Sequence, residues 1–431
     1  MLRWRLTLLL AVAASSQSAW GASVAPAKPA VFTNTEYVEG LAATASALWV
    51  ATRGGVEEYD LRTWQRRRVY TTNDGLPTTA IRDVQVVEGA VVAVLADARC
   101  VLRDGSFRCA PGTAPEPPAP GTPQLFKGAR ITAELQLGPR RLLGTAGQGV
   151  WLAGVHARRL TPAGQLCGNH IMAVAEFANE TWLGTFDEGL CRFDGRAFFN
   201  VSAPFRMVNA MASTTHGLFV ATASGLFRTR DGRHFESVFL FDTRAINDLA
   251  VDGDTLWATS PAVLWKIPLG RHGLPRGYWQ PGGTHSLQAV DVANGQVWLA
   301  SEDRGLLRMH GRKFDVFDRA AGLPTSWMVD VAALPDGSVY GASLRHGLVH
   351  VDQNGKATPV AEISDPWLLR VSRGERGLWV GTQSGAASLD AAGAHALPSL
   401  PHPCVHAIAS STAGVWVGTE GGLALYEPEP R

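Results

Sequence analysis

The sequence has no excess of charge of either sign. Its 431 residues include 39 Lys and Arg against 38 Asp and Glu, a formal net charge of +1. A surface that binds nucleic acid through charge carries clustered basic residues, and usually a marked excess of them. We therefore expect no nucleic-acid partner. Beyond the N-terminal leader, no apolar run approaches the ~20 residues of a membrane helix, so we expect no stable membrane insertion.

Familiar catalytic motifs are also missing. The sequence contains no His-Glu-x-x-His, no Gly-x-Ser-x-Gly, no Gly-Lys-Thr phosphate loop and no Cys-x-x-Cys. His346 and His350 would lie more than ~13 Å apart on a strand, too far to share a metal. His402 and His406, with Pro403 between them, are no better placed. The sequence thus predicts no catalytic residue, no cofactor and no metal, and we expect a protein without enzymatic activity.

The N-terminus has the pattern of a secretory signal peptide. Arg3 and Arg5 precede an apolar run at residues 6–14, and Ala-Trp-Gly at residues 19–21 offers a small-x-small cleavage site. We predict a signal peptide at residues 1–21, cleaved near Gly21, and a short linker at residues 22–29. The mature protein is then expected in a bacterial periplasm or outside the cell.

A repeat organises the rest of the chain. Forty-six glycines, twenty-five prolines and fourteen tryptophans indicate many short strands and turns. A strand of the form Trp-Val/Leu-Gly/Ala-Thr recurs about every forty residues, with one wider gap where a Pro-rich surface loop is predicted at residues 110–124. The copies, two of them degenerate, stand at residues 48–52, 91–100, 142–145, 181–185, 218–222, 256–259, 297–301, 339–343, 378–382 and 415–419.

Each unit predicts four β-strands, the signature of a β-propeller blade. We therefore predict an all-β propeller at residues 30–431, with about ten four-stranded blades. The last unit ends after its third strand, and the segment at residues 30–35 can supply the missing outer strand, so we expect the terminal strands to pair and close the ring. Ten blades exceed the usual four to eight. We favour one ring; two rings with a break near residues 268–283 are the alternative.

Two of the five cysteines can be paired from strand geometry. A two-residue hairpin turn at residues 104–105 sets Leu102 opposite Phe107 and Cys100 opposite Cys109. Directly opposed positions on neighbouring strands are close enough for a disulfide. We predict a cross-strand Cys100–Cys109 bridge.

A second pair, Cys167 and Cys191, belongs to one blade. Cys167 precedes an inner strand and Cys191 begins the third strand, on the same face. Two strand spacings exceed the usual reach of a disulfide, so this bridge requires loop bending and stays an open possibility. Cys404 is left over and is expected to be a small buried apolar residue.

Two linkers resemble a known family. Residues 73–81 read Asn-Asp-Gly-Leu-Pro-Thr-Thr-Ala-Ile and residues 320–328 read Ala-Ala-Gly-Leu-Pro-Thr-Ser-Trp-Met. Together with the aromatic strand that follows, they resemble the two-component regulator propeller repeat of periplasmic sensors in bacterial hybrid histidine kinases. The resemblance implies a sensor-type propeller. Those sensors continue into an Ig-like domain, a membrane helix and a kinase, and this chain is expected to be free-standing.

Function is predicted at the mouth of the central channel. The starts of the inner strands and the turns after the second strands open on one face, where polar side chains would gather around a concave site. Trp327 and Trp367 would add a stacking surface. The alternative for each residue is structural, because charged turns are solvated and inner-strand Asp residues cap neighbouring amides. The candidate binding residues are Arg82, Asp83, Asp187, Asn247, Asp248, Asp330, Arg370, His406, Trp327 and Trp367.

The resulting hypothesis is an exported, monomeric module that binds or senses a protein, a peptide or a carbohydrate. One alternative is a propeller lyase or a glycan-cleaving enzyme at the same mouth, with Asp248 and His406 as an acid–base pair. The other is a structural scaffold of an envelope assembly, which predicts a large exposed apolar patch.

Overall fold

The computed structural model describes residues 28–112, 124–238, 245–270, 274–278, 286–375 and 377–427. The predicted signal peptide (1–21), most of the linker and the centre of the Pro-rich loop lie outside these ranges. The described residues form ten antiparallel sheets, nine of four strands and one of five. This confirms the all-β fold and the ten units.

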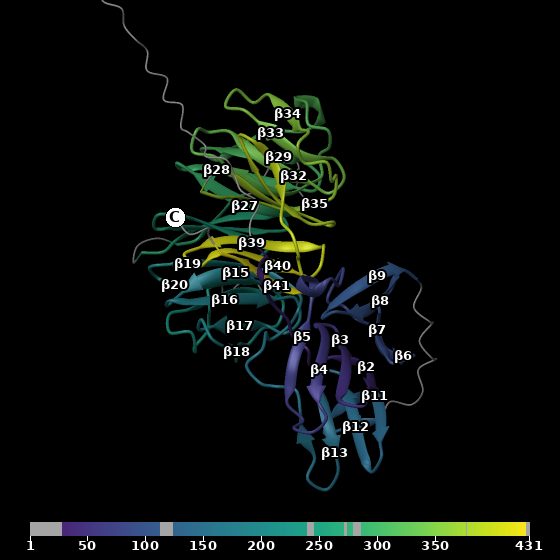
Figure 1. Cartoon of the computed structure of the whole chain (residues 1–431). Coiled ribbons are helices and arrows are strands. Elements are labelled where there is room, and N and C mark those ends of the chain that lie inside the picture. Colours follow the sequence, from purple (N-terminus) through teal and green to yellow (C-terminus); the bar gives the residue numbers. More distant parts are fainter. Residues whose placement is uncertain are drawn as a thin grey trace, which may run out of the picture.

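Seven sheets, which make up the larger body in Figure 1, form a closed ring through contacts between their inner strands. The first, inner strand of each blade packs against the inner strand of the next, and β39 of the last blade packs against β15 of the first. The strands of these blades are β15 (Ile171–Phe177), β16 (Glu180–Thr185), β17 (Leu190–Phe193), β18 (Phe198–Val201); β19 (Val208–Thr214), β20 (Gly217–Thr222), β21 (Gly225–Thr229), β22 (Glu236–Ser237); β23 (Asp248–Asp252), β24 (Thr255–Ser260), β25 (Val263–Pro268), β26 (Arg276–Tyr278); β27 (Leu287–Ala293), β28 (Gln296–Ser301), β29 (Gly305–His310), β30 (Lys313–Phe317); β31 (Met328–Ala333), β32 (Val339–Ser343), β33 (Gly347–Val351), β34 (Ala357–Val360); β35 (Leu368–Arg373), β36 (Leu378–Thr382), β37 (Ala386–Asp390), β38 (Gly393–Ala396); and β39 (Val405–Ser411), β40 (Gly414–Thr419), β41 (Gly422–Tyr426) with β1 (Ala30–Phe32).

The N-terminal strand completes the last blade of the ring. β1 pairs antiparallel with β41, with Ala30 opposite Leu425 and Phe32 opposite Leu423. The Phe32 ring also packs against Phe198 of the first blade, with the ring centroids 5.3 Å apart. The predicted pairing of the terminal strands is thereby confirmed.

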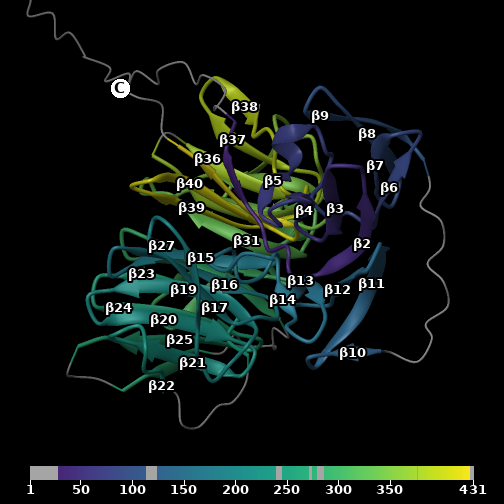
Figure 2. The ribbon, with the colours of Figure 1, turned by 60° about the horizontal axis from the view of Figure 1, so that its bottom comes forward.

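The other three sheets form a separate unit, inserted between β1 and the first blade of the ring (Figure 2). Its strands are β2 (Val38–Ala43), β3 (Ala47–Thr52), β4 (Gly55–Asp60), β5 (Arg66–Tyr70); β6 (Asp83–Val87), β7 (Ala90–Val94), β8 (Ala98–Arg103), β9 (Ser106–Pro111); and β10 (Leu125–Phe126), β11 (Ala129–Leu137), β12 (Arg140–Thr145), β13 (Gly149–Ala153), β14 (Arg158–Arg159).

The prediction of one ten-bladed ring was therefore wrong, and so was the alternative break near residues 268–283. In the three-bladed unit β11 and β6 each pack against β2, so the third blade of the chain lies beside the first. A Cβ on Gly144 would stand 2.4 Å from Val38. The equivalent glycine of the last blade, Gly418, lies against Ile171. Repeat spacing counts blades, but these two close approaches decide which blades are neighbours.

The recurring strand motif has a role for each residue. Its Trp is core: the side chain of Trp298 is fully buried. Its Gly lets two blades approach, since a Cβ on Gly184 would stand 2.3 Å from Val208 of the next blade. Its Thr closes the following turn, as Thr52 Oγ1 donates to the carbonyl of Gly55 at 2.8 Å. The motif is thus structural, as expected.

The two Gly-Leu-Pro linkers form short capped turns. η1 (Thr72–Asp74) and η2 (Arg319–Ala321) are single 3-10 turns that end at Gly75 and Gly322, with φ of 90° and 94°. A residue with a side chain resists this left-handed conformation, which explains the glycine of each linker.

The predicted Cys100–Cys109 disulfide is present, and so is the Cys167–Cys191 bridge that the sequence left open. Cys100 and Cys109 are bonded across β8 and β9 with their Cα atoms 4.0 Å apart, in the predicted register. Cys167, in the segment before β15, and Cys191, in the third strand β17, are bonded with a Cα separation of 5.8 Å. Cys404 is the free cysteine and is half-buried.

Candidate binding face of the seven-bladed ring

One face of the ring carries the start of every inner strand and the end of every second strand. We call it the mouth face. The residue before the inner strand accepts a hydrogen bond from the residue after the second strand, as between His170 O and Phe186 N and between Cys404 O and Glu420 N. In six of the seven blades the inner strand then carries an irregularity after its first residue, at His406 for example. Such bulges re-aim side chains.

Arg82 and Asp83 do not reach this face. Both lie at the start of β6 in the three-bladed unit, where Arg82 is exposed and Asp83 Oδ1 accepts the amide of Val84. Their predicted convergence with the other candidates was wrong, because it assumed one ring. The other eight candidates belong to the seven-bladed ring.

Three of these eight hold adjacent blades together. Asp248 Oδ2 accepts the amide of Val290 at 2.9 Å, and Asp330 Oδ2 accepts the amide of Val371 at 2.8 Å; each amide lies on the next inner strand. Asn247 donates to the carbonyl of the first residue of β27 at 2.6 Å. The two Asp side chains thus perform the alternative structural role of capping backbone amides, and Asn247 caps a backbone carbonyl.

The same carboxyls form a charge network with Arg370. Burial raises the pKa of Asp248, and the negative charge of Asp330 raises it further. Burial also raises the pKa of Asp330, while the positive charge of Arg370 opposes the shift. Arg370 Nε donates to the carbonyl of His406 at 2.5 Å and so joins this network to the last blade. Sequence reasoning missed Asp291, which repeats the pattern on β27 by accepting the amide of Ala333.

The remaining candidates are available to a ligand. Trp327 is 39% exposed, and Asp187 is exposed in the turn after β16. Trp367 is half-buried beneath Arg345, whose guanidinium carbon lies 5.1 Å from the ring centroid. Sequence reasoning missed Phe186, which directly follows the second strand β16 on the mouth face and is 43% exposed. Exposed aromatic groups beside charged ones suit recognition of amphipathic ligands.

The last candidate, His406, belongs to a group that the sequence did not predict. His406 Nε2 lies 3.1 Å from Glu420 Oε1 and 3.4 Å from Cys404 Sγ. Its ring centroid is 4.8 Å from that of His170, the residue before β15. Burial lowers the pKa of both histidines. Cys404 is therefore a polar neighbour of His406, and the expectation of a small apolar residue there was wrong.

One signal in the sequence pointed to part of this group. The bulge residue and the turn residue that pair within a blade are fourteen positions apart: Gln288 and Glu302 in one blade, His406 and Glu420 in another. This spacing finds the His–Glu pair. It does not find His170, whose place beside them depends on ring closure.

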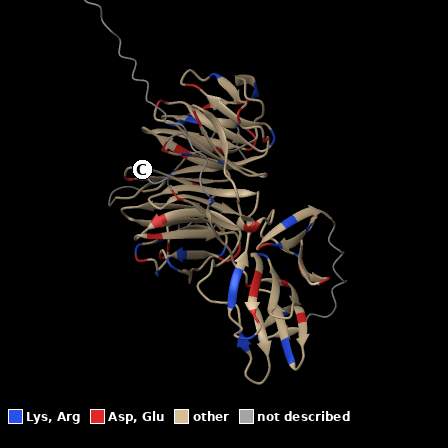
Figure 3. Ribbon diagram, viewed as in Figure 1, with Lys and Arg blue, Asp and Glu red and all other residues tan. Residues whose placement is uncertain are grey.

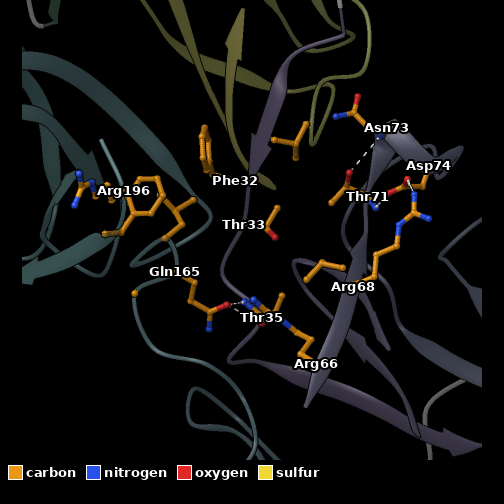
Figure 4. A pocket seen from close by; sticks show the side chains of 15 residues that line it. Phe32, Thr33, Thr35, Arg66, Arg68, Thr71, Asn73, Asp74, Gln165 and Arg196 are labelled. Carbon is orange, nitrogen blue, oxygen red and sulfur yellow. Dashed lines mark hydrogen bonds and ion pairs between the residues drawn. The ribbon is translucent and has the colours of Figure 1, made fainter. Parts of the chain in front are cut away.

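A cavity of about 470 Å³ lies between the ring and the three-bladed unit, lined in part by Thr35, Arg66, Arg68, Gln165 and Arg196 (Figure 4). Its existence follows from how the two units meet, which the sequence did not predict. Thr35 Oγ1 lies 2.8 Å from Gln165 Oε1 across the junction.

The basic side chains of this cavity are largely neutralised. The arginines of β5 stand beside acidic residues of β4 (Figure 3). Arg66 is paired at 2.7 Å with Glu57, which is fully buried, and Arg68 is paired with Asp74. We interpret the cavity as a joint between units, because its main cations already have partners.

Comparison with known proteins identifies the fold. The extracellular domain of the putative hybrid two component system BT4673 from B. thetaiotaomicron superposes with a TM-score of 0.51 at 13% identity, over 90% of this chain and 69% of that one. PorZ, a surface component of the type-IX secretion system of Porphyromonas gingivalis, gives 0.51 at 13% identity, over 90% and 68%. Virginiamycin B lyase from Staphylococcus aureus gives 0.51 at 12% identity, over 59% and 94%.

These identities establish the propeller fold alone. No family model matches the chain, and no curated protein matches it. Among the described residues, no helix is long and apolar enough to span a membrane.

Proposed function

We propose that the chain is an exported binding propeller that recognises a protein, a peptide or a carbohydrate on the mouth face of its seven-bladed ring, without catalysis. The observation that carries the proposal is the set of exposed aromatic and charged side chains there, Trp327, Phe186, Asp187 and the Arg345–Trp367 pair, above inner strands whose own polar groups are committed to structure.

Two further observations support this proposal. The two disulfides fit folding in an oxidising compartment, where such bridges form and persist. The similar structures include an extracellular domain of a two-component system and a bacterial surface component.

An enzyme at the same mouth is the weaker candidate. The acid–base pair considered from the sequence was Asp248 with His406. Asp248 accepts the amide of Val290, and His406 lies against Glu420 and Cys404, so each group already has a partner of its own. The scaffold alternative predicts a large exposed apolar patch, whereas the mouth face carries exposed charged residues such as Asp187 and Arg345 as well as the exposed aromatic residues Phe186 and Trp327.

The test is binding of the mature protein to peptide and envelope-glycan arrays, followed by titration calorimetry of the hits. We expect Trp327→Ala and Arg345→Ala to weaken binding at least tenfold, the size of effect typical of central interface residues. Phe199→Ala is the matched control: Phe199 is 40% exposed on β18, an outer strand away from the mouth. Hits that survive both mouth variants, or that fail only with the Phe199 variant, would refute the assignment.

A further inference from the structure

The seam that closes the ring carries a cluster of potential metal ligands. One ring nitrogen each of His170 and His406 and a carboxylate oxygen of Glu420 lie within 4.8 Å of one another. His170 precedes the first blade, whereas the other two belong to the last blade. The cluster exists only because these two blades meet.

The spacing is close to that of a tetrahedral site. Ligand atoms 2.0–2.3 Å from a tetrahedral zinc lie roughly 3.3–3.7 Å from one another. His406 Nε2 lies 3.1 Å from Glu420 Oε1 and 3.4 Å from Cys404 Sγ. The ligand atoms of His170, His406 and Glu420 lie at most 4.8 Å from one another, and a shift of roughly 1 Å at one ligand atom would bring the widest of these separations into the tetrahedral range.

A hydrogen-bonded His–Glu pair does not explain the whole cluster. His170 Nε2 is buried without a hydrogen-bond partner, an arrangement that is rare for a polar atom. The imidazole is held in place, stacked on Phe186 with centroids 4.9 Å apart and tilted against His406 at 4.8 Å. A metal ion between the two histidines would give His170 Nε2 the partner that it lacks.

The fold explains how these residues come together. His170 and Cys404 occupy the same repeat position, the residue before the inner strand, while His406 occupies the bulge and Glu420 the turn. In another blade the corresponding bulge and turn residues are Gln288 and Glu302, joined at 2.9 Å. The last blade therefore places nitrogen, oxygen and sulfur donors at positions that hold an ordinary polar pair elsewhere.

We propose that His170, His406, Glu420 and Cys404 bind one transition-metal ion of the zinc class at the seam between the first and last blades. Imidazole, carboxylate and thiolate together favour zinc and its neighbours over magnesium or calcium, which prefer oxygen ligands. Binding releases the thiol proton to solvent and draws its donors from three backbone segments: His170 before β15, Cys404 and His406 at the start of β39, and Glu420 after β40. The ion links β15 to β39 and stabilises the closed ring.

The experiment uses untagged mature protein, freed of metal by chelator and titrated with Zn²⁺ alone and with Co²⁺ alone. We expect one equivalent per chain, a rise in Tm with Zn²⁺, and a Co²⁺ spectrum with tetrahedral d–d bands and a sulfur-to-metal charge-transfer band. His170→Ala and Glu420→Gln should each lower the affinity at least tenfold and remove the rise in Tm. Cys404→Ser should remove the charge-transfer band.

The matched control is His346→Ala, since His346 is an exposed histidine in a turn of the same face. It should bind both metals as the unaltered protein does. Circular dichroism of each metal-free variant separates loss of binding from loss of fold, and Glu420 is exposed, so its amide variant keeps the packing. The proposal is overturned if no stoichiometric binding occurs, or if folded His170→Ala and Glu420→Gln proteins bind as tightly as the control. A Co²⁺ spectrum without the charge-transfer band would remove Cys404 from the ligand set.

Discussion

The carboxyl groups of Asp248 and Asp330, on inner strands, have two opposing effects on stability. Each accepts an amide of the next blade and so ties two blades together. Each is also buried beside other charges, which disfavours its ionised form. Replacing them together with Arg370 would disturb the ring itself, so these three residues are poor probes of ligand binding.

This conflict predicts a pH dependence for Asp248→Asn. Burial and the charge of Asp330 raise the pKa of Asp248 above its ordinary value of 3.8. The folded state therefore holds the proton more tightly than the unfolded chain, and the stability from this group is lost as pH rises through the folded pKa. Urea unfolding measures the free energy of unfolding of both proteins. The amount by which the wild-type value exceeds that of the variant should decrease between about pH 5 and about pH 8. An advantage that grows with pH would contradict this assignment.

At several junctions between blades, a glycine of the second strand lets the next blade approach closely. Gly184 admits Val208 of the next blade, and Gly418 admits Ile171 across the closing seam. The strand β1 then covers the outer edge of the last blade. The ring is thus closed twice, by a close packing contact at its inner side and by strand pairing at its outer side.

Gly418→Ala should loosen this seam. An added Cβ would stand 2.7 Å from Ile171 Cγ2 and 3.0 Å from the Ile171 carbonyl oxygen. We expect a loss of ~1–3 kcal/mol in the free energy of unfolding, the usual cost of overpacking a tight contact. Gly270→Ala is the control, because no atom lies within 4 Å of its Cβ position, and its effect should stay within ~0.5 kcal/mol. Equal effects of the two substitutions in chemical denaturation would argue against a tight seam.

The whole molecule is a closed ring carrying a three-bladed insertion. The chain leaves the ring after β1 and returns before β15 at nearly the same place, since Asn34 Nδ2 donates to the carbonyl of Leu166 at 2.8 Å. The insertion has its own apolar cores, such as the one around Tyr59 and Leu142. It meets the ring at the joint where Thr35 contacts Gln165.

The ring should therefore fold without the insertion. Replacing residues 38–161 by a short Gly-Ser linker keeps β1, all seven blades and the seam. We expect a cooperative thermal transition, a β-sheet circular dichroism spectrum and unchanged Zn²⁺ binding at the seam. The same deletion extended to residues 30–37 removes β1 and should lower Tm clearly. If the ring with β1 fails to fold, the two units depend on each other more than their separate cores indicate.

The sequence by itself determined the features that depend on local pattern. Four strands per repeat, the ten units, the core Trp residues, the register of the Cys100–Cys109 hairpin and the pairing of the terminal strands all follow from residue spacing and strand alternation. The candidate residues of the inner strands were found by the same alternation, although for Asp248 and Asp330 their role proved to be structural.

Only the tertiary structure decided which blades are neighbours. Ten similar units can close as one ring or as a ring with an insertion, because each unit offers the same kind of packing face to the next. The choice is made by contacts between distant segments, such as Gly418 with Ile171 and Gly144 with Val38. This arrangement of blades separates Arg82 and Asp83 from the mouth face and places His170 next to His406. The sequence did not predict it, because a contact between the first and last blades of the ring produces no periodic pattern in the chain.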